Sequence, residues 1–222
     1  MRVAVLGWAA VCLCTASVWP SAAQASRQPQ PAIAAAGAAL PQGAVQLARW
    51  VIDSGDHNGL PFGIVDKRSA TIMLYNGRGI LVGASVALLG QTLGDASVAG
   101  VGERTQHRDL RPEDLTTPAG RFESEPGRNT SGEAIVWIDY GSALAIHRLR
   151  PGASRQQRAE RLASSDARRR RVSAGCVVVP EAFYDAVVAP VLGRSRGLVY
   201  VMPESGALSP EQLLAPQTRQ PG

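Results

Sequence analysis

A single cysteine in a glycine-containing turn is the residue of this chain best suited to covalent chemistry. Cys176 ends the stretch Ser173-Ala174-Gly175-Cys176 and is followed by three valines. A thiolate is a strong nucleophile, and backbone N–H groups exposed in a tight turn can stabilise a developing oxyanion. The alternative is a small buried apolar residue, a role that a free cysteine fills equally well.

A thiol nucleophile needs a base beside it, and the chain has three histidines. His57 and His107 lie among polar residues, so both are expected in solvent. His147 ends an apolar run, and strand alternation places it on one face with Ala145 and Leu149. A buried imidazole held in one orientation suits general-base catalysis. Taken alone, His147 is equally compatible with a hydrogen-bonded histidine of the core.

Short strands are expected to position these two residues. They are predicted over residues 62–66, 70–75, 80–86, 133–140, 143–149 and 197–202, with an Asn76-Gly77 type I′ hairpin turn after the second. Helices are predicted in a lead-in segment over 44–59, over 153–163 and over 180–189, and residues 90–102 are expected to form a loop. The fold class is therefore predicted as mainly β with a few short helices.

Residues 1–25 have the pattern of a secretory signal peptide. Arg2 precedes an almost uncharged apolar stretch, and Ala23-Gln24-Ala25 is the small-x-small pattern that signal peptidase recognises. A retained membrane anchor is the alternative. Cleavage would remove Cys12 and Cys14 and leave Cys176 as the one thiol of an exported protein, a pattern that indicates a reactive or intermolecular cysteine. A flexible spacer is predicted over residues 26–43.

Composition limits the class of protein. The chain has 222 residues, of which 45% are hydrophobic and 18% charged, and its formal net charge is +5. This suffices for one domain with a core and excludes a wholly disordered chain. Beyond the N-terminus no apolar run approaches the roughly 20 residues of a membrane helix. We find no internal repeat and no sign of a second domain.

Three motifs, in this order, resemble the L,D-transpeptidase catalytic domain (the YkuD-type family). They are Thr117-Pro118-Ala119-Gly120-Arg121-Phe122, Ala145-Ile146-His147 and Ser173-Ala174-Gly175-Cys176, followed by Pro180-Glu181-Ala182-Phe183-Tyr184-Asp185. The family signature is a histidine on a strand and, after a variable gap, Ser/Thr-His-Gly-Cys with a polar residue two positions on. The resemblance covers about residues 62–203. It implies a β-sandwich or barrel domain of this type over residues 60–204, followed by a C-terminal tail over 205–222.

The resemblance also implies an exported enzyme of the periplasm or cell envelope that acts on peptidoglycan stem peptides. Cys176 would be the nucleophile and His147 its base, with Gly175 and Ser173 supporting an oxyanion loop. The thiolate would attack the diamino acid carbonyl at stem position three and expel the terminal D-alanine. The acyl group would pass to an amine of a second stem, another amine or water. No metal, organic cofactor, nucleic acid or mature membrane span is implied, and a carbapenem adduct at Cys176 is expected.

The chain departs from the family pattern in three ways. Ala174 replaces the usual histidine of the Ser-His-Gly-Cys box, Val178 replaces the usual polar residue, and 29 residues separate His147 from Cys176, a longer interval than usual. Two alternatives therefore stay open. One is a catalytically impaired protein that binds wall peptides, and the other is a thiol hydrolase, an L,D-carboxypeptidase or amidase, acting on the same stems.

The longer interval comes from an arginine-rich insertion over residues 150–171. It is compatible with a solvated basic loop, or with a collar that attracts stem carboxylates and anionic wall polymers to the cleft. Arg148 and Arg171 flank the two candidate catalytic residues. Because arginine pairs bidentately with carboxylates, these two are predicted to bind substrate.

Overall fold

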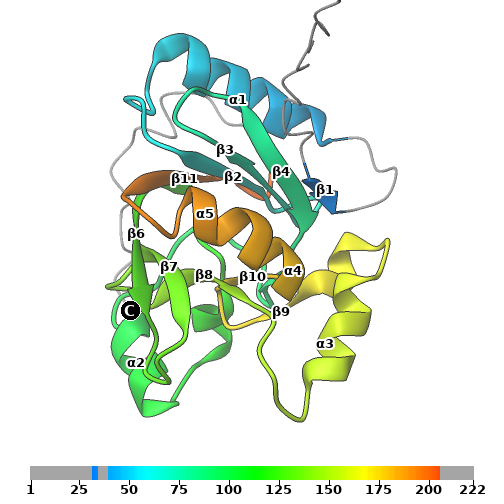
Figure 1. Ribbon diagram of the computed structural model, residues 1–222. Helices are drawn as coiled ribbons and strands as arrows, with labels where there is room; N and C mark the ends of the chain where they lie inside the picture. The colour runs from blue at the N-terminus through cyan, green and yellow to red at the C-terminus, as the bar shows by residue number, and fades with distance from the viewer. Residues whose placement is uncertain (1–31, 35–39, 206–222) are drawn as a thin grey trace, which may run out of the picture.

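A nine-stranded sheet dominates the computed structural model, which describes residues 32–34 and 40–205 (Figure 1). Its strand order is β1-β4-β3-β2-β11-β6-β7-β8-β10. The strands are β1 (Ala32–Ala34), β2 (Phe62–Asp66), β3 (Thr71–Tyr75), β4 (Leu81–Val86), β6 (Gly120–Arg128), β7 (Ala134–Asp139), β8 (Leu144–Arg148), β10 (Val177–Val179) and β11 (Gly197–Val201). Strands β5 (Leu89–Gly90) and β9 (Arg171–Ser173) pair separately. The predicted fold class, mainly β with a few short helices, is confirmed.

Short helices lie around this sheet. They are α1 (Gln42–Ser54), α2 (Val101–His107), α3 (Arg155–Leu162), α4 (Glu181–Phe183) and α5 (Ala189–Val191), and a π-helical segment (Tyr184–Val188) joins the last two into one continuous helix. Two 3-10 turns, η1 (Pro112–Leu115) and η2 (Ala167–Arg170), complete the set. None of the helices in the described part of the chain is long and apolar enough to cross a membrane.

One core joins the two halves of the sheet. Leu74 of β3 and Ile146 of β8 belong to the same buried cluster as Val187 of the continuous helix. Figure 1 shows this helix between the β2–β4 half and the β7–β10 half. Helix α1 covers the opposite side of the first half, where Leu47 and Val51 pack in a second cluster with Phe62. The catalytic candidates lie in the other half, which is anchored on this shared core.

Most strands follow the predicted ranges because the alternation of apolar residues is local. The structure adds β6, which the sequence does not reveal. Its charged residues, Gly127 and Pro126 mask the alternation, and only Gly120, Phe122 and Ser124 are buried within its length. It also adds α2 inside and beyond the expected loop. That short helix packs so closely on the β7–β8 turn that a side chain at Gly102 would overlap the Gly141 carbonyl.

The hairpin between β3 and β4 is confirmed, but the prediction of a type I′ turn is wrong. A type I′ turn needs positive φ at both central residues, and neither Asn76 nor Gly77 has it. Instead the Asn76 side chain accepts hydrogen bonds from the N–H groups of Arg78 and Ile80, and Gly79 takes the left-handed conformation at φ +72°. The side chain of Asn76 therefore shapes a longer connection.

Several predictions concern residues outside the described ranges. The signal peptide over residues 1–25 lies there, as do most of the spacer and the tail beyond residue 205. Of the predicted spacer, residues 32–34 and 40–43 are described: Ala32–Ala34 pair with β4, and Gln42 and Gly43 already belong to α1. Helix α1 falls in the predicted lead-in segment but ends at Ser54, so residues 55–59 are not helical.

Candidate active site

His147 lies on β8, and Cys176 immediately precedes β10, the parallel strand beside it. In the register of β8 and β10, Val177 lies opposite Ile146 and Val178 opposite His147, so Cys176 lies beside Ala145. Ile146 and Val177 point into the shared core. Because side chains alternate along a strand, His147 points to the other face, and the alternation of β10 continued back by one residue would place Cys176 on that face too.

The imidazole of His147 is buried and held as a neutral base. Its Nδ1 lies 2.8 Å from the carbonyl oxygen of Arg148. A carbonyl can only accept, so Nδ1 carries the hydrogen and Nε2 presents its lone pair. Burial, reinforced by the positive charge of Arg150, lowers the pKa of His147 to about 4. At neutral pH this histidine is therefore an oriented, unprotonated base.

The thiol of Cys176 is partly buried and also neutral at rest. Its Sγ donates to the carbonyl oxygen of Ala143 at 3.5 Å. Burial raises the pKa of Cys176, and the backbone of Ala145 and the charge of Arg150 offset this only in part. The resting pair is thus thiol and imidazole rather than thiolate and imidazolium.

A tight turn presents Cys176. The Ser173 hydroxyl donates to the Cys176 carbonyl at 2.7 Å and accepts from the Gly175 N–H at 3.2 Å. Gly175 has φ +112°, and a Cβ there would lie 2.9 Å from the carbonyl oxygen of Thr116. Glycine is therefore required at this position, both for the backbone conformation and for the close approach of the neighbouring chain.

Thr117 of the Thr-Pro motif fastens this turn to the rest of the domain. Its buried hydroxyl donates to the Gly175 carbonyl at 2.7 Å and accepts from the Gly90 N–H at 2.8 Å. The carbonyl of Thr117 accepts from the buried ammonium of Lys67 at 3.0 Å, and that ammonium also pairs with Asp95 at 2.6 Å. Two sequence motifs that lie 58 residues apart are thereby held in contact.

Replacing Thr117 with valine should destabilise the protein and loosen the Cys176 turn. The substitution keeps the shape but leaves the Gly90 N–H and the Gly175 carbonyl without a partner, a cost of about 1–3 kcal/mol. Urea unfolding measures this change. Thr105→Val is the control, because the Thr105 hydroxyl bonds only within its own helix. Equal stabilities for the two variants would contradict the prediction.

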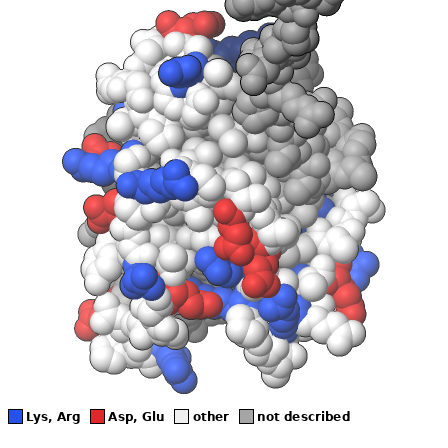
Figure 2. Space-filling view, viewed as in Figure 1, with Lys and Arg blue, Asp and Glu red and all other residues white. Residues whose placement is uncertain are grey.

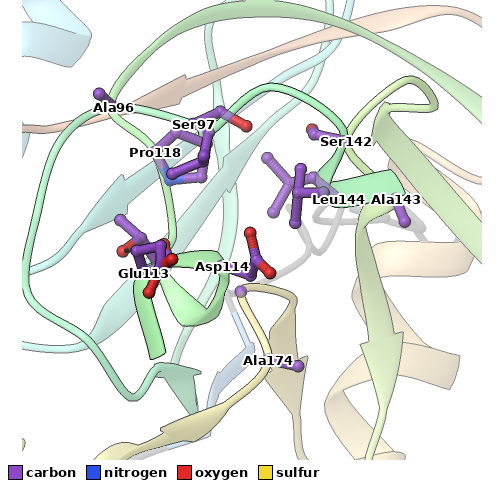
Figure 3. A pocket seen from close by; sticks show the side chains of 13 residues that line it. Ala96, Ser97, Glu113, Asp114, Pro118, Ser142, Ala143, Leu144 and Ala174 are labelled. Carbon is purple, nitrogen blue, oxygen red and sulfur yellow. Dashed lines mark hydrogen bonds between the residues drawn. The ribbon is translucent and has the colours of Figure 1, made fainter. Parts of the chain in front are cut away.

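A concavity lies beside the turn (Figure 3). Its lining includes Ala174, Ala143, Asp114 and Val101, and its volume of about 10 Å³ is close to that of a single water site. Asp114 accepts from the Arg104 Nε at 2.7 Å, and this hydrogen bond lowers the pKa of Asp114. In Figure 3 Asp114 lies between Ala174 and Leu144. The charged pair thus links α2 to η1 beside the Cys176 turn.

Arg148 and Arg171, predicted to bind substrate, lie elsewhere. As the strand neighbour of His147, Arg148 is on the opposite face, where it pairs with Asp185 at 3.1 Å and covers the Tyr184 ring at 4.7 Å. Arg171 donates to Glu204 at 2.7 Å and to the Lys67 carbonyl at 2.8 Å. The structure brings neither arginine to Cys176, and their role in binding substrate stays a prediction.

Arg150 is the cation that sequence reasoning missed. It lies within the electrostatic reach of both Cys176 and His147, and its Nε is 3.0 Å from Glu133 Oε2. Its only sequence signal is its position three residues after His147, where it reads as the first residue of the insertion.

Three further expectations can be compared with the structure. His57, expected in solvent, is only 8% exposed, because its ring packs against Phe62. Val178 is buried with Leu88 and Leu162, which explains why the usual polar residue is absent there.

The arginine-rich insertion is not wholly a solvated loop, since Arg170 is buried and donates to the Ser69 carbonyl. Figure 2 shows acidic and basic side chains interspersed on the face in view.

No group of three or more His, Cys, Asp or Glu side chains in residues 32–34 and 40–205 is placed to hold a metal ion.

Comparisons with known proteins give distant structural likenesses. No protein-family model and no curated protein matches the chain. The helical cell shape determining protein Pgp2 from Campylobacter jejuni is similar over 70% of this chain and 54% of its own, at 15% identity and a TM-score of 0.44. The catalytic domain of an L,D-transpeptidase from E. faecium is similar over 64% of this chain and 95% of that domain, at 17% identity and a TM-score of 0.34. This chain spans little more than half the length of Pgp2.

A third similar structure is a fused Zn-dependent amidase/peptidase/peptidoglycan-binding domain-containing protein from Clostridium acetobutylicum. The likeness covers 70% of this chain and 62% of that one, at 10% identity and a TM-score of 0.37.

Proposed function

We propose that this protein is an exported cysteine-dependent L,D-transpeptidase that acts on peptidoglycan stem peptides. The observation that supports the proposal is a turn-mounted thiol at the start of β10, next to the parallel strand β8 that carries an oriented, neutral imidazole. The motifs that resemble the family supply the substrate class. The secretory pattern of residues 1–25 supports a site of action in the periplasm or cell envelope.

In the first half of the reaction Cys176 becomes acylated. Nε2 of His147 takes the thiol proton as Sγ attacks the carbonyl of the residue before the terminal D-amino acid. The tetrahedral oxyanion is stabilised by backbone N–H groups of the turn. Because the Gly175 N–H is directed at the Ser173 hydroxyl, we assign the main donor to the N–H of Cys176. The imidazolium then returns its proton to the departing amine as the C–N bond breaks.

In the second half an acceptor amine attacks the thioester. His147 takes a proton from the amine, a new amide forms, and the proton returns to the departing Cys176 thiolate. The two steps require only a base, an oxyanion site and an acceptor. With water as acceptor the same site would release a free acid, which is the hydrolase alternative.

Replacing Cys176 with alanine should abolish the acyl-enzyme. We expect the purified protein to gain one equivalent of a carbapenem, and transiently the acyl group of a tetrapeptide stem, by intact mass. The Cys176→Ala variant should gain neither while keeping the thermal unfolding midpoint of the parent within a few degrees. If the folded parent itself stays unmodified, the proposal is refuted and a wall-peptide-binding role is favoured.

Product analysis then separates transfer from hydrolysis. With a diamino acid acceptor present, a transpeptidase yields a cross-linked product at the expense of the free acid. A hydrolase yields the same free acid whether or not the acceptor is added.

A further inference from the structure

Arg150 and Glu133 form an ion pair whose charges act on His147. Strand β7 pairs with β8 so that Val136 lies opposite Ile146, which sets residue 135 opposite His147. Glu133 comes two positions earlier and therefore projects from the same face. Arg150 follows β8, and its Nε is 3.0 Å from the Glu133 carboxylate. The charge of this guanidinium is close enough to act on both His147 and Cys176.

The guanidinium of Arg150 forms an ion pair with Glu133 but no hydrogen bond within the part of the chain that the structure describes. Although Nε is close to Glu133, the N–H is not aligned on the carboxylate, and the Arg150 side chain makes no hydrogen bond to any residue in the described ranges. Glu133 is itself bonded to the Asn129 amide at 2.8 Å. The Arg150 side chain is 37% exposed and that of Glu133 is 31% exposed. A planar cation with five N–H donors and none of them hydrogen-bonded within the described chain is suited to an incoming carboxylate.

The other arginines near the site are either on another face of the sheet or already hydrogen-bonded. Arg148 faces the opposite side of the sheet with Asp185, and the Arg171 side chain is 9% exposed and donates to Glu204. At the position opposite His147, Val178 offers no polar group. Arg158, whose charge also acts on His147, donates to the Arg150 carbonyl. Of the arginines described with an effect on His147 or Cys176, Arg150 is therefore the one whose side chain has no hydrogen-bonded partner in the described chain.

We propose that Arg150 determines donor specificity by binding the free carboxylate on the leaving residue of the acyl donor, taking it in exchange for the contact with Glu133. The inference rests on the proposed function, since it names how that site recognises its donor. The carboxylate lies one residue beyond the attacked carbonyl, so a cation beside the base meets it while Cys176 meets the carbonyl. A donor that ends in a carboxamide has no such carboxylate, and a longer donor carries its carboxylate further from the attacked carbonyl.

The positive charge next to Cys176 can be tested without any peptide donor. Iodoacetate and iodoacetamide alkylate a thiolate by the same displacement of iodide, and they differ in charge. The ratio of their rates at Cys176 therefore reports the local charge and is insensitive to the thiol pKa. Removing one positive charge near the thiol in Arg150→Gln should lower the iodoacetate-to-iodoacetamide ratio by about 3- to 10-fold. Glu133→Gln should raise it.

Arg155→Gln is the matched control, because Arg155 belongs to the same insertion and pairs with the exposed Glu181 at 2.9 Å. Its ratio should equal that of the parent. The inference is overturned if Arg150→Gln leaves the ratio unchanged, or if Arg155→Gln shifts it equally.

A second measurement uses tetrapeptide donors that end in a carboxylate or a carboxamide. The parent should prefer the carboxylate, and Arg150→Gln should lose that preference mainly through KM, with partial recovery in Arg150→Lys. Unchanged preference in Arg150→Gln, in an enzyme that transfers acyl groups, overturns the inference and leaves the proposed function standing. Absence of transfer from every donor refutes the proposed function, while the haloacetate ratio still decides whether Arg150 recruits anions to Cys176.

Discussion

Replacing His147 with glutamine should lower the rate of Cys176 acylation by about 10²- to 10⁴-fold, the usual contribution of a positioned general base. The amide can still donate to the Arg148 carbonyl in place of Nδ1, but it offers no basic nitrogen. The resting thiol has a raised pKa, so little thiolate exists without the base. Single-turnover acylation followed by mass spectrometry measures the rate.

His57→Gln is the matched control for this change. His57 is also nearly buried, and its Nδ1 also contacts a backbone carbonyl, that of Leu60, at 3.2 Å. It lies in the segment after α1, away from β8 and β10. Its loss should leave acylation unchanged. Equal acylation rates in His147→Gln and the parent would show that His147 is not the base.

The lowered pKa of His147 also predicts how the free energy of unfolding depends on pH. The pKa of His147 is about 4 in the folded protein, against an ordinary value of 6.5, so the unfolded chain binds the proton more readily. The stabilisation is full above pH 6.5 and is lost as the pH falls towards 4. A shift of this size corresponds to about 3 kcal/mol. Urea unfolding across this range should show that loss in the parent, and His147→Gln should lack it.

The acid limb of kcat/KM should likewise lie near pH 4, because His147 stays unprotonated above that value. An acid limb near the ordinary histidine value would contradict the burial of this imidazole in the working enzyme.

Replacing Gly175 with alanine should nearly abolish acylation of Cys176. A Cβ at φ +112° is strained, and it would also press on the Thr116 carbonyl from 2.9 Å. Relief of that contact must displace the turn that carries the thiol. A misplacement of about 1 Å costs on the order of 10²-fold in rate, and the strained backbone costs about 1–3 kcal/mol in stability.

Gly152→Ala separates the effect of backbone strain from the effect of the close contact with the Thr116 carbonyl. Gly152 has φ +132°, a similar backbone strain, but no atom lies within 4 Å of the added Cβ. It should lose stability and keep its acylation rate. Comparable rate losses in both variants, measured by single-turnover mass spectrometry, would mean that the close approach to Thr116 does not hold the nucleophile.

The strands could be predicted from the sequence because side-chain alternation is a property of the local chain. The ranges of β2, β7 and β8 follow directly from their apolar residues, whereas β6 could not be recognised because its polar stretch is a strand only through pairing with β11 and β7. His57 illustrates the same limit. Its polar neighbours in sequence predict exposure, but Phe62 covers it in the folded protein.

The candidate chemistry was also visible in the sequence, since one thiol in a glycine turn and one histidine in an apolar strand are distinctive by residue type alone. Only the tertiary structure decided that the segments carrying these residues, 29 positions apart in sequence, lie side by side as β8 and the start of β10. It also decided that both residues are neutral at rest and that the charge of Arg150, rather than that of Arg148 or Arg171, acts on both. The physical reason is that burial, protonation and ion pairing depend on which distant segments become neighbours in the fold. Residue type and the period of a strand, by contrast, are properties of the local sequence.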